Sequence, residues 1–320
     1  MARAVPRAAV RTSLRIAVSA AVLAVLAWRF GARDIAAQCL AARPGPFLGA
    51  LAIYLASQLV SALRWQRLAR GVGFRVGWST CARMYLVGMF FGLAIPSTLG
   101  ADATRAVMLG RQPPGKALAV SCVLFDRLIG LVALAAVAVG ALVVGPTASL
   151  PSAVTLAIAA SGSALVAGWF ATPLLVARLP ESVPGRARLQ RLFTLDLAPY
   201  FRDRALLALA TALSLAVHLL QIASQFVLAR ALGLHPAFGF VAIYHPLVAL
   251  AAAIPVTIGG FGLREATYAL ILPRAGVPAN EAVALGILWW AVGAGGGLIG
   301  GALYAASPAD RPVRGVDEGA

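Results

Sequence analysis

Charged residues are scarce in this chain of 320 residues, since Asp, Glu, Lys and Arg together make up only 12% of it. An average soluble domain has roughly twice that share. Hydrophobic residues make up 61%, and the mean hydropathy is +0.87. This composition excludes an ordinary water-soluble domain, and the polar–apolar alternation of an outer-membrane barrel is missing. We therefore predict an all-α polytopic membrane protein, whose long apolar segments satisfy their own backbone hydrogen bonds.

Motifs for metal binding or catalysis are also lacking. The few cysteines and histidines are widely separated: Cys39, Cys81, Cys122, His218, His235 and His245. No Cys-x-x-Cys pair, His-Glu-x-x-His motif, phosphate-binding loop or nucleophile elbow is present. The sequence therefore predicts no metal site, no cofactor and no catalytic residue, and a protein that is not an enzyme.

Acidic residues are few, with 11 Asp and Glu against 27 Lys and Arg, which gives a formal net charge of +16. Every basic residue except Lys116 is Arg. The arginines cluster in short segments between apolar runs, as expected for cytoplasmic loops of a membrane protein. We therefore expect anionic or zwitterionic membrane lipids as partners rather than nucleic acid.

Six apolar segments are candidate membrane-spanning helices, which need about 20 residues. They are Ile16–Phe30, Pro46–Leu63, Ala117–Val144, Ser152–Ala177, Ala205–Ala229 and Ala282–Tyr304. The first follows four arginines and resembles a signal peptide, but it lacks a small-x-small cleavage site, so an uncleaved helix is the favoured interpretation. We predict one membrane domain over residues 1–320, with halves near 1–145 and 152–305, a loop over 178–204 and a polar tail over 306–320.

Two further apolar regions contain nearly the same motif, 159 residues apart. Residues 94–105 form the first motif and residues 253–265 the second. They share a proline, a threonine two residues on, a glycine two after that and an arginine nine after the proline: Pro96, Thr98, Gly100 and Arg105 match Pro255, Thr257, Gly259 and Arg264. Coincidence in a chain rich in Ala, Gly and Pro is the alternative. Paired, interrupted apolar segments in two halves of a membrane protein point to a substrate site at the bilayer midplane.

The distribution of arginines predicts the topology of the first motif. The N-terminus, residues 64–83 and residues 178–204 are all basic, and we expect them in the cytoplasm together with both chain termini. Two spans lie between the N-terminus and Arg64, and two more lie between Lys116 and Arg178. Arg105–Lys116 must therefore also be cytoplasmic, so Met84–Ala101 enters the membrane and returns to the same side. The alternative is that Met84–Ala101 crosses once and every later loop changes side.

The same reasoning makes Phe238–Leu272 a re-entrant element, or a pair of short spans, that enters from the opposite face. Two similar elements entering from opposite faces form an inverted repeat. We therefore expect re-entrant turns at Pro96, Thr98 and Gly100 in the first motif. The corresponding turns in the second motif are expected at Pro255, Thr257, Gly259, Gly260 and Gly262.

Ionisable residues at membrane depth cost about 2.5–3.5 kcal/mol on insertion scales and usually mark function. We predict six substrate-binding residues on this basis: Asp102, Arg105, Asp126, Arg127, Arg264 and Glu265. Asp102 and Arg105 have the spacing of a helical ion pair, unless they have already reached the cytoplasmic surface. Asp126 and Arg127 point about 100° apart on a helix and should have different partners, although Arg127 could instead extend to the interface.

The glycines before Arg264 predict a break followed by a short helix whose N-terminus favours anions such as lipid phosphate. Arg264 could bind that phosphate, and Glu265 could orient Arg264 or accept a headgroup amine. An ordinary glycine-rich turn near the interface is the alternative. His218 is expected to be a packing residue, whereas His245 has even odds of lining a cavity.

These motifs together resemble the lysylphosphatidylglycerol synthase transmembrane region, also called the flippase-like domain family. The matching stretches are Phe90–Arg105, Phe125–Gly130 and Ile254–Glu265. Ala101, Asp126 and Ile258 depart from the family pattern, where Gly, Glu and Pro are usual. The resemblance covers nearly the whole chain and implies a polytopic inner-membrane domain associated with lipid movement.

Some family members carry an aminoacyl-transferase domain, for which 320 residues leave no room, so we expect that a separate enzyme would synthesise the lipid. We predict a bacterial inner-membrane protein that flips or scrambles a phospholipid or another amphiphilic lipid through a groove between the repeats. The alternatives are an ion-coupled transporter of a small solute and, with less support, a membrane-embedded lipid or glycan transferase. The oligomeric state is not predicted.

Overall fold

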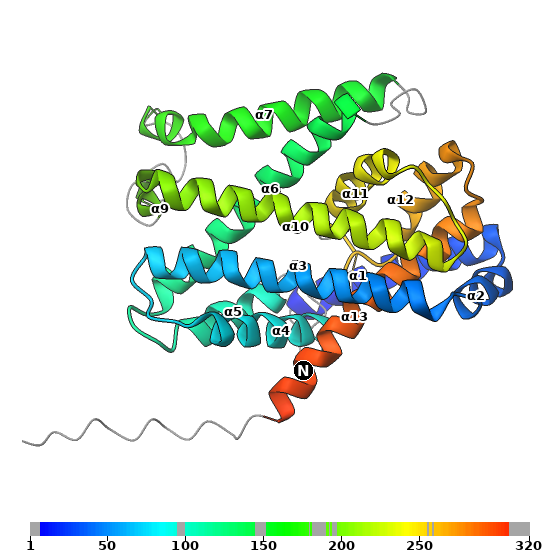
Figure 1. The fold of residues 1–320 in the computed structure, drawn as a ribbon, viewed down its shortest axis with the longest axis horizontal. Helices are drawn as coiled ribbons and strands as arrows, with labels where there is room; N and C mark the ends of the chain where they lie inside the picture. The colour runs from blue at the N-terminus through cyan, green and yellow to red at the C-terminus, as the bar shows by residue number, and fades with distance from the viewer. Residues whose placement is uncertain are drawn as a thin grey trace, which may run out of the picture.

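The computed structural model describes residues 7–94, 100–144, 152–178, 180, 190–191, 193, 197–254, 256–257 and 259–306. Over these residues the chain is helical and contains no strand (Figure 1). Most of the predicted loop 178–204 and the tail from residue 307 lie outside the described part.

Five helices in the described part are long and apolar enough to cross a membrane: α3 (Pro44–Gly71), α6 (Lys116–Val144), α7 (Ser152–Ala177), α10 (Arg204–Ala231) and α13 (Ala279–Ala305). The bent pair α1 (Arg7–Phe30) and α2 (Ala32–Leu40) is apolar enough to form either a sixth, broken span or a re-entrant loop. The two helices meet at 90°, at Gly31, whose φ of 81° is accessible to glycine with little strain. The six predicted spans all lie within these helices.

The first motif lies in a helical hairpin of α4 (Trp78–Ala94) and α5 (Gly100–Leu109). The two helices are antiparallel, because Gly92 of α4 faces Ala101 of α5, and Gly88 faces both Ala101 and Arg105. At 17 residues, α4 is short for a membrane span, which needs about 20. The chain therefore reverses within this region, as predicted for a re-entrant element, and the alternative of a single crossing does not hold.

The second motif lies in an equivalent hairpin of α11 (Phe238–Ala253) and α12 (Leu263–Ile271), which continues into the 3-10 helix η3 (Leu272–Ala275). Gly260 lies against Ala252, and the rings of Tyr244 and Tyr268 are 5.6 Å apart, so these helices are also antiparallel. Figure 1 shows the two hairpins toward opposite ends of the long antiparallel pair α3 and α10. This arrangement is the predicted inverted repeat.

The two repeats consist of α3 to α6 and of α10 to α13, and their first helices, α3 and α10, end in the same way. Gly73 and Gly233, 160 residues apart, have φ of 97° and 75°, and each donates its N–H to an arginine carbonyl 3.1 Å away. The next residue in each case donates to the alanine carbonyl five positions earlier. This pattern is a Schellman cap, in which a left-handed glycine closes a helix. Both long helices are 28 residues, so the repeats match in length as well as in order.

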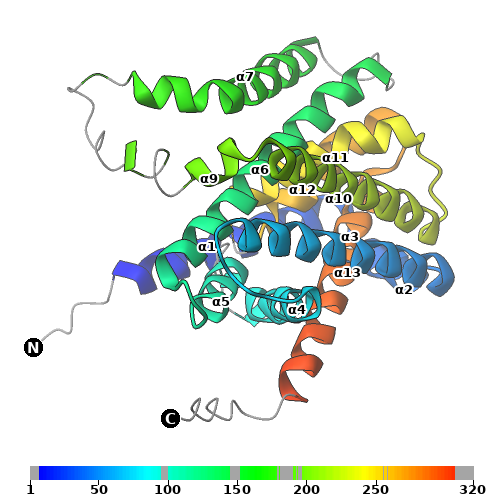
Figure 2. The same ribbon diagram turned by 60° about the vertical axis from the view of Figure 1, so that its left-hand side comes forward.

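Glycines allow α13 to lie directly on α4. A side chain at Gly300 would overlap the backbone of Leu86, and Gly296 and Gly297 meet Met89 and Leu93. Close approach of two helices through small residues is the usual packing mode in membranes. Helices α3 and α5 also pack on α4, whereas α7 packs against α6 and the short α9 (Ala198–Arg202) lies at the start of α10 (Figure 2).

Candidate functional site

The first charged cluster is built on α5, which begins immediately after the break in the first hairpin. Asp102 lies in the first turn of α5, where a carboxylate is favoured by the helix dipole. It forms an ion pair with Arg105 one turn later, as the three-residue spacing predicted. Both residues are buried rather than exposed at the cytoplasmic surface.

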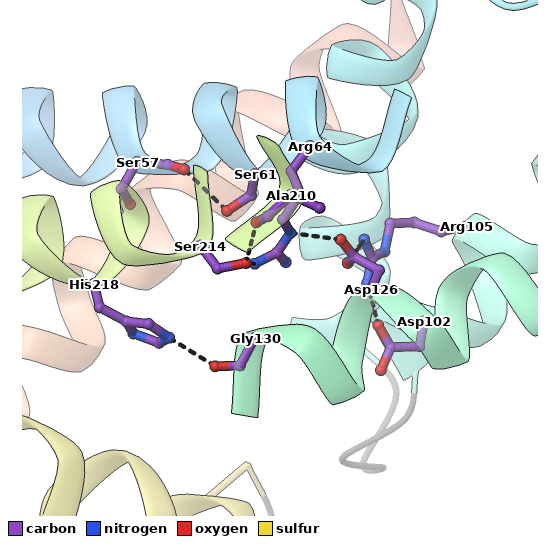
Figure 3. A network of polar contacts seen from close by, with 10 residues as sticks. All are labelled: Ser57, Ser61, Arg64, Asp102, Arg105, Asp126, Gly130, Ala210, Ser214 and His218. Atoms are coloured by element: carbon purple, nitrogen blue, oxygen red, sulfur yellow. Dashed lines mark hydrogen bonds and ion pairs between the residues drawn. The ribbon is translucent and has the colours of Figure 1, made fainter. Parts of the chain in front are cut away.

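Asp126 of α6 joins this cluster from a different helix. Arg64 Nε of α3 donates to Asp126 Oδ1 at 2.8 Å, and Arg105 Nη1 lies 3.3 Å from Asp126 Oδ2. Arg64 Nη1 also donates to Ser214 Oγ of α10 at 2.8 Å. These contacts join residues of α3, α5, α6 and α10 (Figure 3). A fully buried carboxylate is therefore held between two buried guanidinium groups.

Arg127 has a different partner from Asp126, as predicted from the helical geometry. Its Nε lies 2.5 Å from Asp102 Oδ2, while 57% of its side chain remains exposed. We name Arg64, Asp102, Arg105, Asp126 and Arg127 the first cluster. Three arginines and two aspartates give it a net charge of +1 when all are ionised.

Aromatic rings complete the surroundings of Arg105. Its guanidinium carbon lies 4.4 Å from the ring centre of Tyr85 and 5.3 Å from that of Trp65. Such cation–π contacts contribute about 0.5–2 kcal/mol each, with the larger values where the groups are desolvated. These ring contacts hold the Arg105 guanidinium in place in addition to its ion pairs with Asp102 and Asp126.

Sequence reasoning missed Arg64 as a site residue, because it was grouped with the basic residues of the following loop. In the structure α3 continues to Gly71, two turns beyond Arg64, and the side chain is buried. A signal was present: Asp126 within an apolar span requires a cationic partner, and Arg64 is one of the basic residues that directly adjoin a predicted span.

The second hairpin carries a more compact ion pair. Glu265 is completely buried, and its Oε1 accepts hydrogen bonds from Arg264 Nε at 2.9 Å and Nη2 at 2.5 Å. Its Oε2 accepts from the backbone N–H of Gly262 at 2.7 Å, at the start of α12. Glu265 thus orients Arg264, as predicted, and its own carboxylate occupies part of the helix N-terminus predicted to attract an anion. The Arg264 guanidinium carbon lies 5.2 Å from the centre of Phe261.

The two breaks differ in detail. Gly259, Gly260 and Gly262 have φ of 57°, 79° and 88°, so the second motif turns through left-handed glycines. The matching Gly100 is already the first residue of α5, whereas α12 begins four residues after Gly259. Thr257 is buried, and its hydroxyl has no partner among the described residues. The predicted turn residues Pro96, Thr98 and Pro255 lie outside the described residues.

A cavity of about 330 Å³ lies between the two hairpins. It is lined by Tyr54, Met89, Leu93, Gln221, Arg264, Trp289, Trp290, Gly293 and Ala294. These residues come from α3, α4, α10, α12 and α13, so both repeats contribute to the wall. Arg264 is the charged residue of this lining, and the lining also includes the aromatic rings of Tyr54 on α3 and of Trp289 and Trp290 on α13. We name this space the hairpin cavity.

A larger depression of about 580 Å³ lies over residues 70–77, at the end of α3. It contains Arg70 and Arg75 but no member of either charged pair or cluster, so we take the hairpin cavity as the candidate site. The described residues contain no group of three or more His, Cys, Asp or Glu side chains able to hold a metal ion.

Comparison with protein families identifies this arrangement. Residues 13–301 match the family model of the lysylphosphatidylglycerol synthase TM region, and this range includes both hairpins and all of the spans except the end of the last one. Comparison with curated proteins gives no match. The match extends over most of the sequence, and the chain therefore belongs to the lysylphosphatidylglycerol synthase transmembrane-region family.

Proposed function

We propose that this protein moves a phospholipid or another amphiphilic lipid across a bacterial inner membrane. The lipid headgroup passes between the two hairpins while the acyl chains stay in the bilayer, and both chain termini face the cytoplasm. The observation that carries this proposal is the hairpin cavity, in which a buried arginine lies between the two hairpins.

The chemistry of the cavity suits an anionic group attached to a larger apolar molecule. Arginine binds phosphate through several N–H donors, and Glu265 holds Arg264 in position for it. Tyr54, Trp289 and Trp290 provide an apolar wall beside the charge. A cavity of about 330 Å³ is at the lower end for small-molecule sites, so it suits a headgroup rather than an entire lipid.

The energetic barrier to lipid movement is the transfer of a charged headgroup through hydrocarbon. A protein lowers this barrier by replacing lost hydration with fixed polar groups along the path. The first cluster and the Arg264–Glu265 pair supply such polar groups, and we infer that both lie at membrane depth. A separate enzyme would make the lipid.

The test is lipid movement in proteoliposomes, followed with fluorescent phospholipids and an impermeant quencher. Gly293 lines the hairpin cavity, and a Cβ there would meet only the Tyr54 hydroxyl, at 3.7 Å. Gly293→Leu should therefore fill the cavity and slow lipid movement about tenfold or more. The matched control is Gly140→Leu on α6, an exposed position with nothing within 4 Å of an added Cβ.

Wild-type activity that Gly293→Leu leaves unchanged would exclude the hairpin cavity as the path. A wild-type protein that moves none of the phospholipids tested would contradict the proposal itself. Uptake of a soluble solute in the same vesicles would then favour the ion-coupled transporter. Thermal unfolding of both variants in detergent should match the wild type, which separates blocked passage from misfolding.

A further inference from the structure

A chain of hydrogen bonds connects the second hairpin to α10 and α11. The Tyr268 hydroxyl of α12 donates to Gln225 Oε1 of α10 at 3.0 Å, and Gln225 Nε2 lies 2.8 Å from His245 Nδ1 of α11. A phenol hydroxyl donating to the amide oxygen fixes the orientation of the amide, so Gln225 Nε2 is the donor to His245. His245 Nδ1 is therefore an acceptor, and the ring proton is on Nε2.

His218 of α10 has its tautomer fixed by a different contact. Its Nε2 lies 3.0 Å from the backbone carbonyl oxygen of Gly130 on α6, as Figure 3 shows. A carbonyl oxygen can only accept, so His218 Nε2 carries the proton and Nδ1 has a free lone pair. Both histidines are thus Nε2–H tautomers.

The two remaining ring nitrogens are complementary. His245 Nε2–H is a donor, His218 Nδ1 is an acceptor, and both are buried without a hydrogen-bond partner in the described structure. The ring centres are 5.8 Å apart, and His245 is only 2% exposed. A buried polar atom left unpaired costs about 1–3 kcal/mol. The donor and acceptor therefore favour each other as partners, directly or through one water molecule.

We propose that His218 and His245 form a proton-binding site that links the second hairpin to the first cluster. The inference rests on the proposed function, because the linked process is lipid movement between the hairpins. The proton comes from solvent water and forms an N–H bond with the lone pair of His218 Nδ1, which converts the ring to an imidazolium cation. His218 then faces His245 with a donor instead of an acceptor, and the complementary pair is lost.

The charged groups around the pair determine the direction of the effect. On the His218 side, Arg64 of α3 lies against the same Gly130 and holds Asp126 of α6. On the His245 side, α11 contributes Tyr244, and α12 contributes Tyr268 and, one turn earlier, the Arg264–Glu265 pair. A cation at His218 repels Arg64 more than it attracts the already paired Asp126. Proton uptake therefore loosens the contact between α3 and α10, which carry Arg64 and His218, and we expect acidification to speed lipid movement.

The tautomers can be tested without any transport assay. The chain has only three histidines, so ¹⁵N-histidine NMR of the protein in nanodiscs gives three sets of ring signals. His235→Gln removes the exposed third ring and leaves the proposed pair. At neutral pH both remaining rings should be neutral Nε2–H tautomers. An Nδ1–H tautomer at either residue would overturn the proposal.

The linkage to transport is tested by the pH dependence in proteoliposomes. Burial of His218 Nδ1 and the Arg64 cation nearby disfavour protonation of the ring, so wild-type lipid movement should rise about fivefold between pH 6 and 4, below the ordinary titration range of histidine. His218→Gln retains a donor for Gly130 but has no titratable ring, and its rate should change by less than about twofold over this range. His235→Gln should behave like the wild type.

Two outcomes overturn the linkage: a wild-type rate independent of pH, or a His218→Gln variant that keeps the full pH dependence. If no variant moves lipid at all, the proposed function fails. The NMR measurement still decides whether the histidine pair exists, so the two failures are distinguishable.

Discussion

Asp126 and Trp289 are each the eleventh residue of the last long helix in their repeat. Asp126 holds Arg64 and Arg105 and belongs to a filled, charged cluster. Trp289 contacts Tyr54, with ring centres 5.4 Å apart, and lines the hairpin cavity. At this equivalent position, one repeat thus has an ion-paired carboxylate and the other has an aromatic ring that lines open space. The difference arises from side chains rather than from the backbone.

Replacing Asp126 should destabilise the protein because it leaves two buried guanidinium groups short of a carboxylate. Asp126→Ala is expected to lower the free energy of unfolding by about 3–5 kcal/mol. The double variant Arg64→Met/Asp126→Leu should cost less than Asp126→Ala, since it removes both charges while Arg105 retains Asp102. Thermal unfolding in detergent measures both. A double variant less stable than Asp126→Ala would show that Arg64 stabilises the protein through the packing of its aliphatic stem rather than through its charge.

Arg127→Leu should abolish lipid movement while leaving stability close to that of the wild type. The side chain is 57% exposed, and an ion pair at such a site contributes about 0–1 kcal/mol to folding. The control is Arg83→Leu on α4, another exposed arginine. Equal lipid movement in both variants would show that Arg127 anchors the helix at the membrane interface and is not needed for lipid movement.

Arg264→Leu should also abolish lipid movement, but it leaves Glu265 buried without its cation. A loss of about 3–5 kcal/mol in stability should therefore accompany the loss of activity. For this reason a lower yield of folded protein is expected as well, unlike for Arg127→Leu. Retained activity in a folded Arg264→Leu sample would remove Arg264 from the lipid path.

Gly259 should tolerate asparagine better than valine. Its φ of 57° is left-handed, and nothing lies within 4 Å of an added Cβ, so conformation and not space limits the substitution. Asparagine adopts this region more readily than a β-branched residue does. Gly259→Val should impair lipid movement, and Gly259→Asn should retain most of it. Gly262→Asn should fail, because its Cβ would lie 2.9 Å from Val22.

The topology can be checked by labelling with an impermeant thiol reagent, after replacement of the three native cysteines. A cysteine at Ser149, which lies outside the described residues, and one at Ala275 should label from outside. Ala275 is preferable to Gly276, whose φ of 78° disfavours a side chain. A cysteine at Arg111 should not label, since the segment before Lys116 is expected in the cytoplasm. External labelling at position 111 would reverse the orientation of the first hairpin.

Periodic and local features of this fold were predictable from the sequence. Apolar length placed the six spans, and the charge of the loops required both hairpins to return to their own side. The pairing of Asp102 with Arg105 followed from a spacing of three on a helix, and the pairing of Glu265 with Arg264 from their adjacency. These features depend on residues close together in the chain.

Contacts between distant helices could not be predicted in the same way. Arg64 bonds to Asp126, which lies 62 positions away in the sequence. Because Arg64 begins a long basic stretch, nothing in the sequence indicated that its side chain is buried. Trp289, Trp290 and Tyr54 looked like ordinary span residues, because only the crossing of α3 and α13 makes them a cavity wall. His218 bonds to a backbone carbonyl, a partner with no sequence signal at all.

The length of α3 between the two sites determines how strongly lipid movement responds to the membrane potential. Tyr54 of the hairpin cavity and Arg64 of the first cluster are ten residues apart on one helix, about 15 Å along its axis. That is about half the thickness of the hydrocarbon core. A singly charged headgroup that travelled this interval would cross about half of the transmembrane potential, about 1.1 kcal/mol per 100 mV. The rate for an anionic lipid would therefore respond to voltage, whereas the rate for a zwitterionic lipid would not.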